Sequence, residues 1–169
     1  MKAGPLADSA DGVAVDASGL IYVSGSTAAS KFSSGLEVNY QFPNIISVFG
    51  PDLIKEANGV PDAFVATLDP SGVRPLRAAI IGSFNHEIDV HVALGAGGTV
   101  WLAGSIVGDF FSSEGNSSFP QVHAFQPPSS FGDFSSGIAN ASDGFVAQLN
   151  ADLTQLLFSS LFGGVGHNS

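Results

Sequence analysis

The segment DAFVATLD at residues 62–69 recurs as DGFVAQLN at residues 143–150. The shorter segment VAVD at 13–16 returns as VALG at 92–95, so the two motifs come in the same order in both halves of the chain. A unit repeated at a period of roughly 80 residues is usually a supersecondary block that packs against its neighbours instead of folding alone. The sequence therefore predicts two similar blocks, at 1–88 and 89–169.

The composition favours strands over helices. Of the 169 residues, 44% are hydrophobic and only 12% are charged, and the chain contains 21 glycines, 14 phenylalanines and 9 prolines. This mixture is typical of short strands joined by turns and is poor for long solvent-exposed helices. Cysteine is absent, which excludes disulfides and thiolate metal sites. We therefore expect an all-β protein with enough apolar material for a sizeable core.

Each repeat contains four strand-like segments separated by turn signals, of which DPSG at 69–72 is the strongest. The expected strands are 12–16, 20–24, 63–68 and 73–81 in the first repeat, and 92–94, 99–103, 144–149 and 153–162 in the second. A four-stranded meander that occurs twice predicts two antiparallel blades of the β-propeller type.

Long inserts rich in Phe, Ser and Pro, at about 27–60 and about 106–141, separate the two hairpins of each repeat. They are longer than ordinary loops of a compact domain. Each Phe is worth about 1.5–3 kcal/mol when fully buried, so this aromatic area is not left in water. The inserts either fold back over the blades or form an interface with another molecule. The interface candidates are Phe32, Phe42, Phe49, Phe110, Phe111, Phe119, Phe125, Phe131 and Phe134.

The charge of the chain argues against anionic partners. The formal net charge is -10, and all five basic residues lie in the first repeat. Binding to nucleic acid or to an anionic membrane surface needs clustered Lys and Arg, so we expect neither. No segment is long and apolar enough to span a bilayer. A cation or a basic partner fits this charge better.

The densest polar cluster is HEIDVH at 86–91. In a regular strand, Glu87, Asp89 and His91 lie on one face, where two carboxylates and an imidazole could hold a metal ion. The alternative is a junction between blades whose polar residues face solvent or cap turns. We expect no resident cofactor, with calcium as the alternative.

Other polar residues stand at strand ends. Asp16, Asp69, Asn150 and Asp152 follow strands and are expected to accept backbone hydrogen bonds within turns. Asp62 and Asp143 begin the third strand of each repeat, where bonding to a neighbouring loop is the first expectation and calcium ligation the second.

Tyr22 and Trp101 occupy equivalent positions on the second strand of each repeat. We expect both in the core, with a sugar-stacking platform as the alternative.

No catalytic constellation can be recognised. The chain lacks a Gly-x-Ser-x-Gly elbow, and its fifteen scattered acidic residues do not single out a catalytic pair. We therefore expect a protein that is not an enzyme, with a hydrolase as the less favoured alternative.

The repeated segments VAVD at 13–16, IYVSGST at 21–27 and DAFVATLDPSG at 62–72 resemble the bacterial β-propeller repeats often labelled SBBP. The resemblance covers nearly the whole chain in two copies, of which the second is more degenerate. It implies one four-stranded blade per copy and an extracellular or cell-surface setting, and it carries no catalytic residues. The inserts are longer than in such repeats, and only two copies are present.

Two blades cannot close a propeller, which takes about four to eight. The exposed flanks would be covered by further blades of a longer chain, by a closed ring of chains or by a filament. We therefore expect a non-enzymatic extracellular structural or adhesive protein that associates with itself through blade edges and Phe-rich inserts. The alternative is a carbohydrate- or calcium-binding module of a larger surface propeller.

Overall fold

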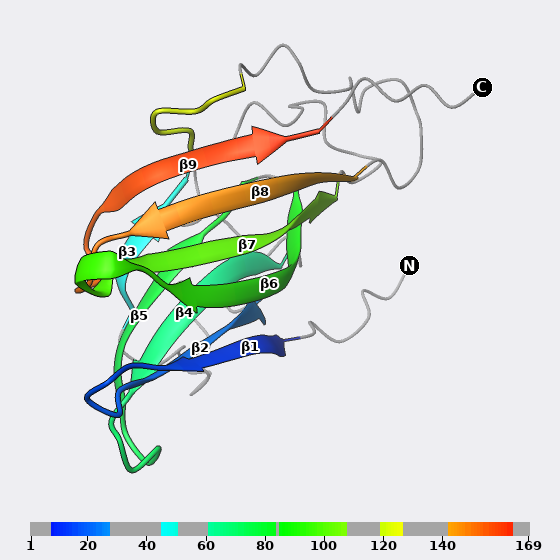
Figure 1. Cartoon of the computed structure of the whole chain (residues 1–169). Coiled ribbons are helices and arrows are strands. Elements are labelled where there is room, and N and C mark those ends of the chain that lie inside the picture. The colour runs from blue at the N-terminus through cyan, green and yellow to red at the C-terminus, as the bar shows by residue number, and fades with distance from the viewer. Residues whose placement is uncertain are drawn as a thin grey trace, which may run out of the picture.

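The computed structural model describes residues 8–27, 45–50, 61–83, 85–107, 119–126 and 142–163. These residues form two β-sheets (Figure 1). In this part of the chain the only helical element is a single 3₁₀ turn, η1, at Ala96–Gly98. The prediction of an all-β fold is confirmed.

The first sheet is an antiparallel meander with one added strand. Its strand order is β1-β2-β4-β5-β3, and β3 runs parallel to β5 whereas the other pairs are antiparallel. The strands are β1 Ser9–Val15, β2 Ile21–Thr27, β3 Ile45–Phe49, β4 Asp62–Leu68 and β5 Pro75–Ile81. The meander matches the four strands expected for the first repeat.

The second sheet is a four-stranded antiparallel meander in the order β6-β7-β8-β9. Its strands are β6 His86–Leu94, β7 Val100–Val107, β8 Ser142–Leu149 and β9 Leu156–Phe162. The register matches that of the first sheet, because Tyr22 pairs with Thr67 and the equivalent Trp101 pairs with Gln148. The repeat seen in the sequence is therefore a repeat of strand pairing.

Part of each insert covers the outermost strand of its meander. β3 pairs along β5, and the backbone N–H of Gly82 donates to the carbonyl oxygen of Phe49 at 3.1 Å. In the second repeat, Val122 forms an antiparallel bridge with Ser159 of β9, with N–H to carbonyl distances of 3.1 and 2.9 Å. These segments fold back over the blades, as the first of the two alternatives proposed. A strand at 45–49 was not predicted, because a short apolar run without alternation gives little periodic signal.

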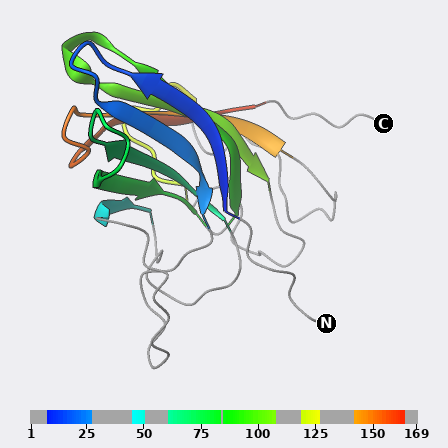
Figure 2. The same cartoon turned by 90° about the horizontal axis from the view of Figure 1, so that it is seen from below.

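The two sheets pack face to face around one core. β6 lies against β1, β2 and β4, as Figures 1 and 2 show. The buried core side chains are Tyr22, Ala63, Val65, Ala79 and Ile81 from the first sheet, and Val90, Val100, Leu102, Ile106, Phe145, Ala147, Leu149 and Leu161 from the second, with Leu153 from the β8–β9 turn and Phe119 from the insert. Burial of apolar surface is the dominant stabilising term in folding, so this shared core holds the two repeats as one unit.

Both first strands carry a β-bulge at the same place. The pairing register shifts between Ala10 and Gly12 in β1, and between Ile88 and His91 in β6. At the second bulge Asp89 has φ of 55°, in the left-handed region that Asp tolerates better than most residues. A bulge interrupts the alternation of side chains along a strand, and this determines where the polar residues of β6 point.

Candidate functional site

The joint between the sheets is fixed by two side chains that hold the backbone of one residue. Ser24 Oγ donates to the carbonyl oxygen of Val90 at 2.6 Å, and the Val90 N–H donates to Asp11 Oδ2 at 3.0 Å. Val90 is fully buried, so neither of its backbone groups could turn to water instead. We call Asp11, Ser24 and Val90 the clamp.

A glycine allows the sheets to approach closely beside the clamp. A Cβ atom on Gly12 would lie 2.6 Å from Ser24 Oγ, 3.0 Å from Val92 N and 3.2 Å from His91 Cα. Two of these three neighbours are backbone atoms of β6, which cannot move aside as the end of a flexible side chain would. Gly12 therefore permits the observed distance between β1 and β6.

The carboxyl groups of Asp62 and Glu87 are hydrogen-bonded to each other near the joint between the sheets. Glu87 is fully buried, and its Oε1 and Oε2 accept hydrogen bonds from Ser83 Oγ at 2.5 Å and from Ser83 N at 3.3 Å. Burial raises the pKa of Asp62 to about 7, although its hydrogen bond to Glu87 acts in the opposite direction. Burial also raises the pKa of Glu87 well above its ordinary value, against the Ser83 hydrogen bond and assisted by the charge of Asp62. Burial therefore favours the protonated, uncharged form of both carboxyl groups in the folded chain.

The metal site predicted at Glu87, Asp89 and His91 is not formed, and this prediction is wrong. Glu87 is buried whereas Asp89 and His91 are exposed, because the bulge between Ile88 and His91 breaks the alternation on which the prediction depended. Within the described ranges, no group of three or more His, Cys, Asp or Glu side chains could hold a metal ion. The other reading of this cluster, a junction whose polar residues face solvent, fits the exposed Asp89 and His91 but not the buried Glu87.

The acidic residues after strands cap turns, as predicted. Asp16 Oδ1 accepts from Ser18 N at 2.8 Å and from Leu20 N at 3.0 Å. Asp69 Oδ1 accepts from Val73 N at 3.2 Å, and the Asn150–Asp152 turn is closed in the same way through Thr154 N. Hydrogen bonds lower the pKa values of Asp16, Asp69 and Asp152, foremost those from the hydroxyls of Ser18, Ser71 and Thr154 respectively.

Asp62 and Asp143 occupy equivalent packing positions. A Cβ atom on Gly82 would lie 2.1 Å from Asp62 Oδ1, and one on Gly163 would lie 1.9 Å from Asp143 Oδ1. Each carboxyl group thus packs against the glycine that follows the last strand of its meander. The counterpart of Glu87 in the second repeat, Asn168, lies outside the described residues.

The interface candidates fall into four groups. Phe119 is only 2% exposed and packs against Phe145 with ring centroids 5.2 Å apart, so it belongs to the core and is not available for an interface. Phe49 is half-buried. Phe125 is 63% exposed and stacks on Phe158, with centroids 6.4 Å apart and an interplanar angle of 13°. The remaining candidates, Phe32, Phe42, Phe110, Phe111, Phe131 and Phe134, lie outside the described residues.

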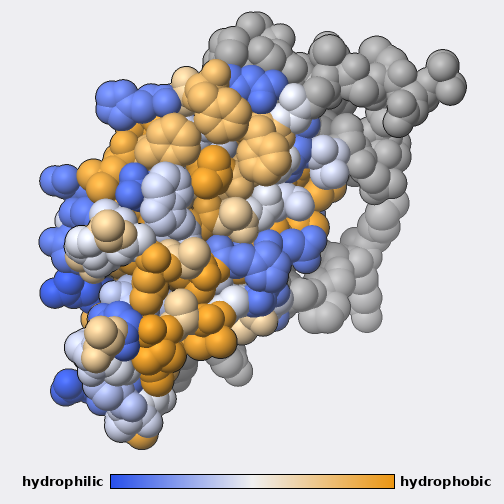
Figure 3. Space-filling view, in the orientation of Figure 1, coloured by the Kyte–Doolittle hydropathy of each residue, from blue (hydrophilic) through white to orange (hydrophobic). Residues whose placement is uncertain are grey.

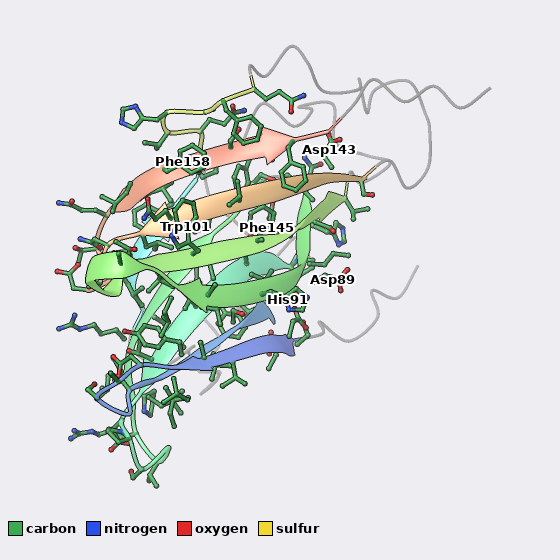
Figure 4. All side chains as sticks on the ribbon, in the orientation of Figure 1. Asp89, His91, Trp101, Asp143, Phe145 and Phe158 are labelled. Atoms are coloured by element: carbon green, nitrogen blue, oxygen red, sulfur yellow. The ribbon has the colours of Figure 1, made fainter. Side chains whose placement is uncertain are left out.

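Tyr22 and Trp101 differ in environment although their positions are equivalent. Tyr22 is buried between the sheets, which confirms its predicted place in the core. Trp101 alternates with the buried Val100 and Leu102, so it lies on the opposite, outer face of the second sheet, and its prediction is wrong. There it approaches Phe158, with centroids 6.0 Å apart (Figure 4).

The difference between Tyr22 and Trp101 holds for the whole sheet faces on which they lie. The face of the first sheet that carries Tyr22 packs on the second sheet, whereas the corresponding face of the second sheet, with Trp101, is turned outward. Figure 3 shows hydrophobic side chains gathered over the second sheet on the side turned to the viewer. The outer face of the second sheet includes Trp101, Phe158 and Phe162, and Phe162 is 48% exposed.

The outer face of the first sheet is only partly sheltered. Its centre holds a second buried cluster, Phe64, Ala66, Ala78 and Ile80. Along its β1 margin, Val13 is 69% exposed and Val15 is 59% exposed. Their equivalents in the second repeat, Val92 and Leu94, pack against the core between the sheets. Positions that are covered in one repeat are thus open in the other.

Neither a scan against models of protein families nor a search of curated proteins finds a match to this chain. Among the residues described, no helix has the length and apolar character needed to cross a membrane.

Proposed function

We propose that this chain is a non-enzymatic extracellular structural protein in which two propeller-type blades form one unit that associates with further copies of itself. The observation that supports this most is the reversal of faces. The two repeats pack head to tail, with the Tyr22 face of one against the opposite face of the next. A head-to-tail interface leaves one unused face at each end and is completed only by a ring, a filament or further repeats.

Exposed apolar side chains lie on the two outer faces that a head-to-tail arrangement leaves uncovered. Val13 and Val15 are exposed at one end of the stack, and Trp101, Phe158 and Phe162 are at least partly exposed at the other. A large apolar patch on a monomer is uncommon and usually marks an interaction surface. An adhesive or scaffolding role follows from such an assembly, and an extracellular setting follows from the resemblance of the repeat to exported propeller repeats.

Association through the outer edges of the blades is less favoured than the sequence suggested. β3 covers the edge of β5, and Val122 bridges to the edge of β9. Covering an edge in this way blocks the backbone pairing by which sheets extend sideways. We therefore place the contacts between copies on the sheet faces.

Light scattering across the micromolar range, followed by electron microscopy, tests this proposal. The expected result is a mass that rises with concentration, together with rings or fibres. A monomer whose mass stays constant throughout would contradict the proposal.

A carbohydrate-binding role is the second candidate, because Trp101, Phe158 and Phe125 form a partly exposed aromatic cluster on one sheet face. Aromatic faces of this kind can also contact sugar rings. A glycan array that stays without signal would remove this candidate.

A further inference from the structure

We infer that the outer face of the second sheet around Trp101 takes the β1 margin of a second copy, with Val13 and Val15 of that copy against it. The inference rests on the proposed function and specifies the partner and the surface. It follows from the packing that the chain already shows between its own two repeats.

The internal joint shows which strands meet. There, β6 packs on β1, β2 and β4, and its residues Val92 and Leu94 pack against the core. The joint between two copies is obtained by applying the same packing to the next pair of repeats. The second repeat of one copy then supplies β6, β7 and β8 in place of β1, β2 and β4. The first repeat of the other copy supplies β1 in place of β6. Val13 and Val15 then occupy the places of Val92 and Leu94.

The exposed residues on the two outer faces are consistent with this contact between β1 of one copy and the Trp101 face of another. On the receiving face, Ala93 and Ala103 are exposed, and Trp101 and Val146 are half-buried. On the partner, the β1 margin is open, whereas the cluster around Phe64 is already buried. The contact between copies is therefore centred on β1 and does not extend over the whole blade face.

The joint between copies cannot be as close as the internal one. His91 stands in the second repeat at the position of Gly12, and Ala103 at the position of Ser24. His91 carries a side chain at the position where Gly12 leaves room for the backbone of the next sheet, and Ala103 provides no hydroxyl to hold that backbone. The internal joint is thus permanent, whereas the contact between copies is looser and reversible.

The chain contains its own reporter for this contact, because Trp101 is its single tryptophan. Docking of apolar side chains removes water from the indole, so the emission of the wild-type chain should shift to shorter wavelength as concentration rises. The shift should follow the mass measured by light scattering.

Two blocked variants separate the two surfaces. Val13→Lys with Val15→Lys blocks the β1 margin, and Ala103→Lys blocks the receiving face. All three positions are exposed, so the substitutions should leave the folding of the unit intact. The controls place the same change at exposed turn residues, Val73→Lys and Ala96→Lys. Lysine lowers the net negative charge, so repulsion between copies cannot explain a loss of association.

Each blocked variant alone should show at least a tenfold higher dissociation constant than the wild type, and the controls should not differ from it. Mixed together, the two blocked variants should form a one-to-one dimer and nothing larger, because each retains the surface that the other lacks. The double variant His91→Gly with Ala103→Ser reproduces the Gly12 and Ser24 positions of the internal joint and should lower the dissociation constant at least threefold.

Several outcomes would overturn the inference. If the wild type associates but the blocked variants associate equally well, or if the two blocked variants do not combine, the contact is elsewhere while the proposed function stands. If the wild type never associates, both fail. If cellohexaose shifts the Trp101 emission of the chain but leaves association unchanged, the receiving face binds sugar while the copies meet elsewhere, and the inference is wrong.

Discussion

The buried carboxyl pair of Asp62 and Glu87 should make the fold lose stability as the pH rises from about 5 to about 7. Both groups have pKa values raised by burial, so the folded chain holds protons that the unfolded chain has already released. The stabilising contribution is fully present below the unfolded pKa of about 4 and is lost as the pH rises through the folded pKa. This direction is opposite to that of a salt-bridged carboxylate.

The size of the effect follows from the shift of Asp62. Its pKa rises from 3.8 to about 7, a difference of about three units. At about 1.36 kcal/mol per unit the full effect is about 4 kcal/mol, of which about 2 kcal/mol falls between pH 5 and pH 7. Glu87 adds to this loss in the same direction, because burial raises its pKa well above the ordinary value. The turn residues with lowered pKa values, such as Asp16, titrate below this window.

Urea unfolding of the wild type and of Asp62→Asn at several pH values measures the effect. The variant should be clearly less sensitive to pH, by about 2 kcal/mol over the window, because it has lost one of the two groups. Asp89→Asn removes an exposed carboxylate from β6 and controls for the loss of one negative charge. Equal pH dependence of Asp62→Asn and the wild type, or a wild type that gains stability from pH 5 to pH 7, would refute the reasoning.

Three further changes probe the clamp, the core and the first hairpin. Ser24→Ala leaves the buried carbonyl of Val90 without its donor and should lower the free energy of unfolding by about 1–3 kcal/mol in urea titration. Phe119→Ala should cost about 3–5 kcal/mol by the same measurement, and a loss below 1 kcal/mol would show that this insert residue is not part of the core. Gly25→Ala places a Cβ atom 1.9 Å from Ser9 O, so β1 must shift away from β2 and the midpoint of thermal unfolding should fall by several degrees.

The strands and turns could be predicted because their signals are local. DPSG at 69–72 and Asp16 act through hydrogen bonds within a few residues, and the structure confirms both turns. β3 was missed because its pairing with β5 depends on a distant part of the chain. The prediction that Glu87 and Asp89 share one face was wrong for a different reason. A bulge that has no recognisable local sequence signal shifts the alternation of side chains by one position.

Trp101 illustrates a limit of reasoning from repeats. Equivalent positions have equivalent partners only inside an uninterrupted series, and among the residues that the structure describes no third sheet packs on the second. Tyr22 therefore lies in the core while Trp101 lies on an outer face. The sequence shows that the two positions correspond, but only the packing shows that one of them is at the end of the stack.

The connections of this fold are divided between its two ends. The four tight turns after β1, β4, β6 and β8 lie at the left and lower left in Figure 1, whereas β2 and β7, which the long inserts follow in the sequence, end at the opposite side. Strand alignment is set by the tight turns and by the paired backbones, so changes of length in most of the insert sequence leave it untouched. Such a design suits the display of variable peptide: a foreign epitope placed in these connections would be carried by a frame that does not have to adjust to it.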